Sequence, residues 1–125
     1  LVAVMPACFE VGAELSCTPV DLAASPLVLA RRQAAPVRSA FGERGVQPQV
    51  ACLVDDVRTA ALWAREGMGV ALVPRSLIRV TDTGEQFIKV LECRELETRP
   101  AVVWRADRTL PSLAERAISL LGELA

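Results

Sequence analysis

Short apolar runs that alternate with helical segments are the feature of this sequence that most constrains its fold. The runs at 26–30, 47–54 and 70–73 have the length and composition of strands, and the run at 26–30 is typical of a buried strand. Segments with helical signals lie between them, at 35–45 and 56–66. Strands that alternate with helices in this way pair side by side in the same direction. The pattern therefore predicts the α/β class, with a mostly parallel sheet and helices on both faces.

The helix expected at 56–66 shows how the layers should fit together. Val57, Ala60, Ala61 and Ala64 fall at positions i, i+3, i+4 and i+7, so one face of this helix is apolar. Because most of these side chains are small, the helix can lie close to a sheet. Gly67 is well placed to end it in a left-handed turn.

Further elements are expected on both sides of this core. Thr18 and Pro19 are typical of the N-cap and the first residue of a helix, so a short helix should begin there. The remaining expectations are a strand at 1–6, a short helix from 74, a turn at 81–85, a half-exposed strand at 87–93, a strand at 99–106 and a last helix from 111. That last helix carries an apolar stripe made of Leu113, Ala117, Leu120, Leu121 and Leu124.

The composition of the chain and its first residue limit the functions that are possible. The 125 residues are 52% hydrophobic, enough for the core of one domain or of a large piece of one. A net charge of -1 argues against a basic nucleic-acid-binding surface. No run has the length of a membrane span, and no signal segment opens the sequence. Because the first residue is Leu1 rather than methionine, we interpret the chain as part of a larger protein.

The residues that enzymes use are largely missing. Without histidine, neither Ser-His-Asp nor Cys-His catalysis is available. Asp55 and Asp56 are adjacent and point in different directions, so they do not form an acid–base pair, and Asp56 is better placed to cap the next helix. Gly67 and Gly69 follow a helix and precede a strand, which is the wrong order for a phosphate-binding loop. We expect no catalytic residue and no enzyme activity.

The cysteines and tryptophans are expected to be structural. Four widely spaced cysteines without histidine do not suggest a metal site, and no cofactor motif is present. Cys52 lies in an apolar run, which favours reduced, buried thiols, although two disulfides would be open to a secreted protein. Trp63 and Trp104 are expected to pack in the interior.

Two segments stand out as a candidate binding site because each directly follows an apolar strand. Open parallel sheets bind ligands at the carboxyl ends of their strands. The first segment is Ala30, Arg31 and Arg32, where an arginine could bind a carboxylate through two hydrogen bonds, or could simply face solvent. The second is Asp55, Asp56 and Val57, where backbone N–H groups at a helix start could add hydrogen bonds.

The stretch "LWAREGMGVALVPRSLIRV" resembles the signature of the effector-binding domain of LysR-type transcriptional regulators. Gly67, Gly69, Ala71 and Pro74 fall on the family pattern of helix, glycine turn, strand and short helix. Three other segments agree in the right order: "TPVDLAASPLVLARR", "AFGERGVQPQV" and "VVWRADRTLPSLAERAISLL". The resemblance covers nearly all of the chain, although Phe9-Glu10-Val11 stands where the family often carries His-Pro-Leu.

This resemblance implies a fold and a function. The family's effector domain is similar to type 2 periplasmic binding proteins, with two α/β lobes around a ligand cleft. Residues 1–98 would form the second lobe, and residues 99–125 would supply the return crossover strand and the final helix, which would pack on the first lobe. The chain would then sense a small-molecule effector, with contacts in the two segments named above.

Partners and location also follow from the resemblance. It implies a cytoplasmic regulator that forms a homo-oligomer, has no membrane or cofactor partner and binds DNA only through a helix-turn-helix domain outside this chain. A carboxylate is the expected kind of effector. The alternative is a lobe of a periplasmic-type solute-binding protein from a transport system, which would need a signal or lipidation segment.

Overall fold

A mixed six-stranded sheet with the order β2-β6-β1-β5-β3-β4 forms the centre of the computed structural model, which describes residues 1–9, 11–78 and 86–124. The strands are β1 (Val2–Pro6), β2 (Ser16–Cys17), β3 (Pro26–Ala30), β4 (Gln49–Val54), β5 (Val70–Val73) and β6 (Gln86–Leu91). The α-helices are α1 (Pro19–Leu22), α2 (Ala34–Gly42), α3 (Val57–Arg65) and α4 (Ser112–Leu124). Short 3-10 helices are η1 (Ala7–Phe9), η2 (Arg31–Gln33), η3 (Arg75–Leu77) and η5 (Arg94–Leu96).

The expected parallel core is confirmed. Strand β3 pairs in parallel with both β4 and β5, so that Val28 lies opposite Cys52 on one side and Ala71 on the other. Strand β1 runs antiparallel between β5 and β6, and β2 pairs in parallel with β6. Most pairings among the described strands are therefore parallel, and β1 makes the sheet mixed.

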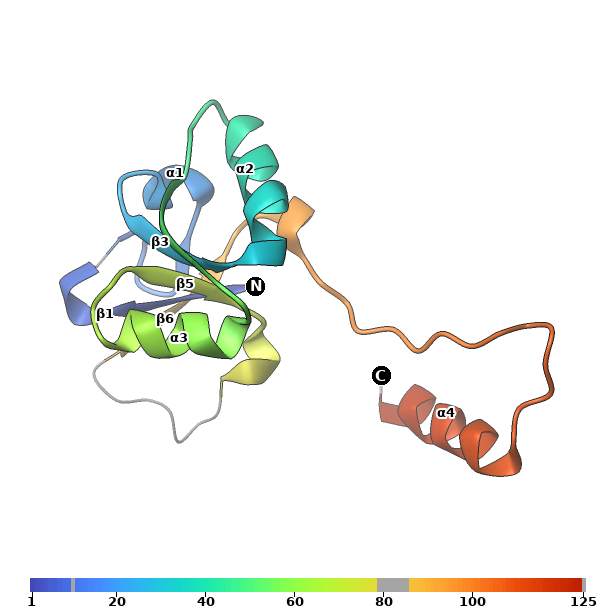
Figure 1. Cartoon of the computed structure of the whole chain (residues 1–125). Helices are drawn as coiled ribbons and strands as arrows, with labels where there is room; N and C mark the ends of the chain where they lie inside the picture. The colour runs from blue at the N-terminus through green and yellow to red at the C-terminus, as the bar shows by residue number, and fades with distance from the viewer. Residues whose placement is uncertain (10, 79–85, 125) are drawn as a thin grey trace.

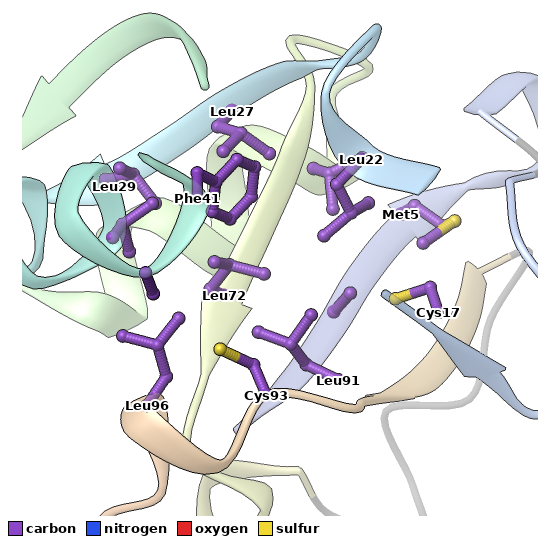
Figure 2. Close-up of a cluster of buried hydrophobic side chains, with 14 residues drawn as sticks. Met5, Cys17, Leu22, Leu27, Leu29, Phe41, Leu72, Leu91, Cys93 and Leu96 are labelled. Carbon is purple, nitrogen blue, oxygen red and sulfur yellow. The ribbon is translucent and has the colours of Figure 1, made fainter. Parts of the chain in front are cut away.

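Helices cover both faces of this sheet, as predicted. Helices α1 and α2 lie on one face and α3 on the other (Figure 1). Along β5 the buried side chains alternate: Val70 and Leu72 join the core under α2, whereas Ala71 and Val73 join the core under α3. Figure 2 shows Phe41 of α2 on the first face, near the leucines of β3. Because the central strands are buried on both faces, their sequences read as continuous apolar runs.

The helix boundaries follow the capping residues. The Thr18 side chain accepts a hydrogen bond from the Asp21 amide, and the Asp21 carboxylate accepts one from the Thr18 amide, so α1 begins with a capping box. The Asp56 carboxylate caps α3 by accepting a hydrogen bond from the Thr59 amide. Gly67 has φ of 86°, the left-handed conformation expected just after this helix.

Gly69 is needed for a close approach between two strands. A Cβ atom at this position would lie 2.5 Å from the carbonyl oxygen of Pro26, at the start of β3. Any larger residue would push the starts of β3 and β5 apart. The two glycines around Met68 therefore serve the helix end and the sheet, in agreement with the rejection of a phosphate-binding role.

Several expectations from the sequence are wrong. Residues 99–106 form no strand: this segment is exposed and leads away from the sheet to α4, which has no buried residue (Figure 1). A strand needs a partner for its backbone N–H and C=O groups, and no described strand pairs with this segment. Trp63 and Trp104 are exposed rather than packed in the interior. The short strand β2 was not predicted, and the turn expected at 81–85 lies outside the described residues.

The four cysteines are free in this structure. Cys17 and Cys93 are buried, Cys52 is partly buried and Cys8 is exposed. Burial raises the pKa of the Cys17 thiol to about 11, so this side chain is a protonated, unreactive thiol at neutral pH.

Candidate functional site

The two segments predicted from the sequence meet at one edge of the sheet. In the parallel pair of β3 and β4, Ala30 lies opposite Val54, so both strands end at the same level. Each candidate segment begins there, and a hydrogen-bonded ion pair links them: the Arg31 Nε donates to the Asp55 Oδ1 at 3.3 Å. The structure therefore brings together residues that are far apart in the sequence.

This ion pair faces solvent. The Arg31 side chain is 69% exposed and the Asp55 side chain is 92% exposed. Neither residue lines the cavity described below. An exposed pair of this kind contributes little to stability, and here it joins the two strand ends at the rim of the site.

A cavity of about 810 Å³ lies at the same edge, a volume in the range of small-molecule sites. Arg32 and Val57, from the two predicted segments, line it. The rest of the lining comes from the residue before β1, from η2 and α2, from the residues after β5 and from the segment around η5: Leu1, Gln33, Pro36, Val37, Pro74, Arg75, Ser76, Glu95, Leu96, Glu97, Thr98, Arg99 and Pro100. The cavity thus occupies the carboxyl edge of the parallel strands, where open α/β sheets bind ligands.

Asp56 is directed toward its own helix. Its carboxylate accepts hydrogen bonds from the Thr59 amide at 2.8 Å and from the Thr59 hydroxyl at 3.1 Å. Principally because of the Thr59 amide, the pKa of the Asp56 carboxyl is lowered. Asp56 is therefore an anionic cap at the N-terminus of α3, and Val57, the first residue of that helix, faces the cavity.

Gln33 fixes the chain where β3 ends, and sequence reasoning missed it. Its Oε1 accepts a hydrogen bond from the amide of the buried Ala30 at 3.1 Å. Its Nε2 donates to the carbonyl oxygen of Leu72 in β5 at 2.9 Å. Gln33 thus ties the ends of two neighbouring strands together and orients the turn that carries Arg32.

Arg75 is a second missed residue, and it lines the cavity together with Arg32. A signal for it does exist in the sequence, once the strand register is known. Val28 lies opposite Ala71, and each arginine comes four positions after its strand residue. The two arginines therefore follow adjacent strand ends at the same level.

A cluster around Glu95 holds the outer wall of the cavity in place. The Glu95 Oε2 accepts hydrogen bonds from the Arg44 Nη2 at 2.9 Å and from the Cys93 Sγ at 3.3 Å. The Arg44 Nη1 also donates to the carbonyl oxygen of Ala40, near the end of α2. Mainly because of Arg44, the pKa of the Glu95 carboxyl falls to about 2. Together with the buried Leu96, these contacts fasten η5 to α2.

The chemistry of this edge is that of a binding site. Arginine side chains and apolar surface line the cavity, and the one hydroxyl pair on its wall, Ser76 and Thr98, has no histidine to activate it anywhere in the sequence. Within the described part of the chain, no three histidine, cysteine or acidic residues lie together as metal ligands would. Nor does any described helix have the length and apolar character that crossing a membrane requires.

Sequence comparisons place these features among known proteins. A family model for the LysR substrate binding domain matches residues 1–125. The HTH-type transcriptional regulator IlvR of Caulobacter vibrioides is 34% identical over 121 residues, which cover 90% of this chain and 38% of that protein. The regulator BsdA of Bacillus subtilis is 26% identical over 106 residues, which cover 81% of this chain and 37% of that protein. The chain thus spans under two fifths of the length of these two relatives.

Solved structures share the fold. HinK, a LysR family transcriptional regulator from Pseudomonas aeruginosa, has a TM-score of 0.65 at 20% identity, covering 99% of this chain and 46% of that one. The C-terminal domain of a probable LysR family regulator from Rhodococcus sp. RHA1 has a TM-score of 0.65 at 23% identity, covering 97% of this chain and 62% of that one. At these identities the likeness shows the fold.

Proposed function

Because this chain belongs to the LysR substrate-binding domain family, we propose that it is the effector-sensing portion of a DNA-binding transcriptional regulator. The observation that carries this proposal is the match of the family model over all 125 residues. The cavity at the carboxyl edge of the sheet supports it, because a sensor needs a site for a small molecule. The two curated relatives are both named transcriptional regulators, whereas nothing favours the alternative of a solute-binding protein from a transport system.

Our proposal for the domain organisation is that residues 1–98 form the second lobe of a two-lobed effector domain. Residues 99–125 would then return to the first lobe, with 99–106 as the connecting segment and α4 packing against that lobe. The exposed stripe of α4 supports this, since Leu113 is 79% exposed and Leu124 is 84% exposed. The regulator would act in the cytoplasm as a homo-oligomer, with its DNA-binding domain outside this chain.

The proposed effector site comprises Ala30, Arg31, Arg32, Asp55, Asp56 and Val57. The geometry suggests different roles for them. Arg32 and the start of α3 at Val57 would contact the effector, since both line the cavity. The Arg31–Asp55 pair and the cap formed by Asp56 would hold the two segments in position.

Calorimetric titration of the full-length regulator separates these roles. Arg32→Ala should weaken effector binding roughly ten-fold or more, because one charge-assisted hydrogen bond is lost. Arg31→Ala should weaken it less, since its guanidinium pairs with Asp55 at the rim. Equal binding by both variants and the parent protein would reject this site.

The DNA-binding part of the proposal calls for a direct test. In gel-shift assays, the full-length protein should bind its operator sequence specifically, whereas residues 1–125 alone should not. This fragment has a net charge of -1, and no recognition helix is identifiable among the elements that the structure describes. Nanomolar, sequence-dependent binding by the fragment itself would contradict the assignment, as would a full-length protein without any DNA affinity.

A further inference from the structure

We propose that Arg32 and Arg75 together form a two-armed clamp for one carboxylate, and that the effector is a small carboxylic acid with an apolar body. This inference rests on the proposed function, because it assumes that the cavity is the effector site. It adds Arg75, from a third strand end, and an apolar body for the expected carboxylate. Three features support it: the placement of the two arginines, the absence of an anionic partner for either among the described residues, and the apolar walls beside them.

The placement follows from the sheet register. Strands β3 and β5 are parallel neighbours, and Arg32 and Arg75 each come four residues after a matched pair of residues in these strands. Backbones of neighbouring strands are about 4.8 Å apart. Two arginines that leave adjacent strand ends on the same edge, and that line one cavity, can approach a common anion from two sides.

Neither arginine has an anionic partner in the residues that the structure describes. Ion pairs there involve Arg31, Arg44 and Arg105, which bind Asp55, Glu95 and Asp107. Arg32 and Arg75 instead remain exposed at the cavity. A carboxylate between them would make a charge-assisted interaction with each, and guanidinium groups bind carboxylates with well-defined geometry.

The carboxylates that line the cavity do not neutralise the positive charges of Arg32 and Arg75. Glu95 is already neutralised by Arg44, which holds its pKa near 2. Glu97 is the other carboxylate of the lining, and Arg99 stands two positions from it on the same outer segment. The charge of Arg32 and Arg75 is therefore available to a ligand.

Apolar side chains make up the remaining walls and indicate what the rest of the ligand is like. Pro36 and Val37 contribute from α2, Val57 from α3, Pro74 from the end of β5, and Leu96 and Pro100 from the outer segment. A hydrocarbon group placed against these walls would be removed from water, which stabilises a complex by about 25 cal/mol for each Å² buried. A carboxylate at one end of an apolar body matches both halves of this lining.

The test uses the full-length regulator and three probe acids: hexanoate, 4-methylpentanoate and phenylacetate, each paired with its neutral primary amide. Binding is measured by calorimetry. At least one acid should bind, and its amide should bind at least ten-fold more weakly. Arg32→Gln and Arg75→Gln should each lower the affinity for that acid about ten-fold or more. Arg38→Gln, an exposed position of α2 outside the cavity, is the matched control and should leave it unchanged.

Three results would overturn the proposal: no binding by any of the three acids, equal binding of an acid and its amide, or an acid affinity that Arg75→Gln leaves intact. Thermal melting without ligand shows whether each variant is folded, and Arg75→Lys keeps the charge at this position if glutamine disturbs it. Arg75→Lys should show an intermediate loss, because lysine lacks the planar fork. Failure of the underlying function would look different, since the full-length protein would then not bind DNA either.

Discussion

At the scale of single residues, the electrostatics of Glu95 give the clearest expectation. Its folded pKa, about 2, lies below the usual value of 4.5, chiefly because it accepts a hydrogen bond from Arg44. A carboxyl with a lowered pKa stabilises the folded state fully above its usual pKa. That contribution disappears as the pH falls from about 4.5 toward 2. Acid should therefore weaken the attachment of η5 to α2.

Melting curves of Glu95→Gln and the parent chain between pH 6 and pH 2 can check this. The parent should be more stable at pH 6, and the difference should shrink as the pH falls. Glu97→Gln is the control, because no ion pair of Glu97 is present in the described structure. A difference that stays constant across this pH range would show that Glu95 does not act through its charge.

The sequence alone identifies a residue of the candidate site only where that residue comes just after a recognisable apolar strand. The segments that carry Arg32 and Val57 directly follow apolar strands, and the tendency of open sheets to bind ligands at their carboxyl edge is enough to select them. Arg75 also follows a strand end, but it comes after Pro74, where the sequence predicts a short helix rather than a binding segment. Gln33 could not be found in this way, because its role depends on a hydrogen bond to Leu72, far away in the sequence.

At the scale of elements, α3 illustrates how side-chain size sets the distance between layers. Ala60 and Ala64 are completely buried between this helix and the sheet. Ala60→Leu should therefore destabilise the fold by about 1–3 kcal/mol, because the extra carbon atoms overfill a packed interior. Urea unfolding would measure the change.

The matched control is Ala35→Leu, which makes the same substitution on an exposed position of α2. It should change the free energy of unfolding by no more than about 0.5 kcal/mol. If both substitutions had equally small effects, α3 would not be held tightly against the sheet.

The strand predicted at 99–106 shows that a strand cannot be predicted from the composition of its own segment alone. Its composition is suitable for a strand, and the helix after it formed as predicted. Composition does not supply a hydrogen-bonding partner, and no described strand offers one. By contrast, β3, β4 and β5 were predictable because their partners lie in the same run of alternating strands and helices: one α-helix separates β3 from β4, and the next strand and helix separate β3 from β5.

At the scale of the whole molecule, the exposed stripe of α4 has a consequence for solution behaviour. Leu113, Leu120, Leu121 and Leu124 are all exposed on one helix. Apolar surface of this kind favours association. We expect residues 1–125 alone to associate in a concentration-dependent way in sedimentation velocity experiments.

Replacing Leu120 and Leu121 with serine should shift this equilibrium toward the monomer. The double substitution of the exposed Leu62 and Met68 with serine, at and just beyond the end of α3, serves as the control for general loss of apolar surface. A fragment that stays monomeric at high concentration without any substitution would contradict the expectation. So would an equal effect of the control.

The position of β1 also bears on how this protein is made in the cell. Val2 pairs with Val73 on one side and with Val90 on the other, so β1, which is synthesised before the other described strands, lies between two strands that are made after it. Its neighbours are synthesised only much later, and pairing across such long stretches is slow. During translation the apolar segment Val2–Met5, which is buried in the folded protein, therefore stays exposed to solvent until β5 and β6 have been synthesised. Nascent chains stalled before β6 should be especially prone to aggregation and should depend on chaperones.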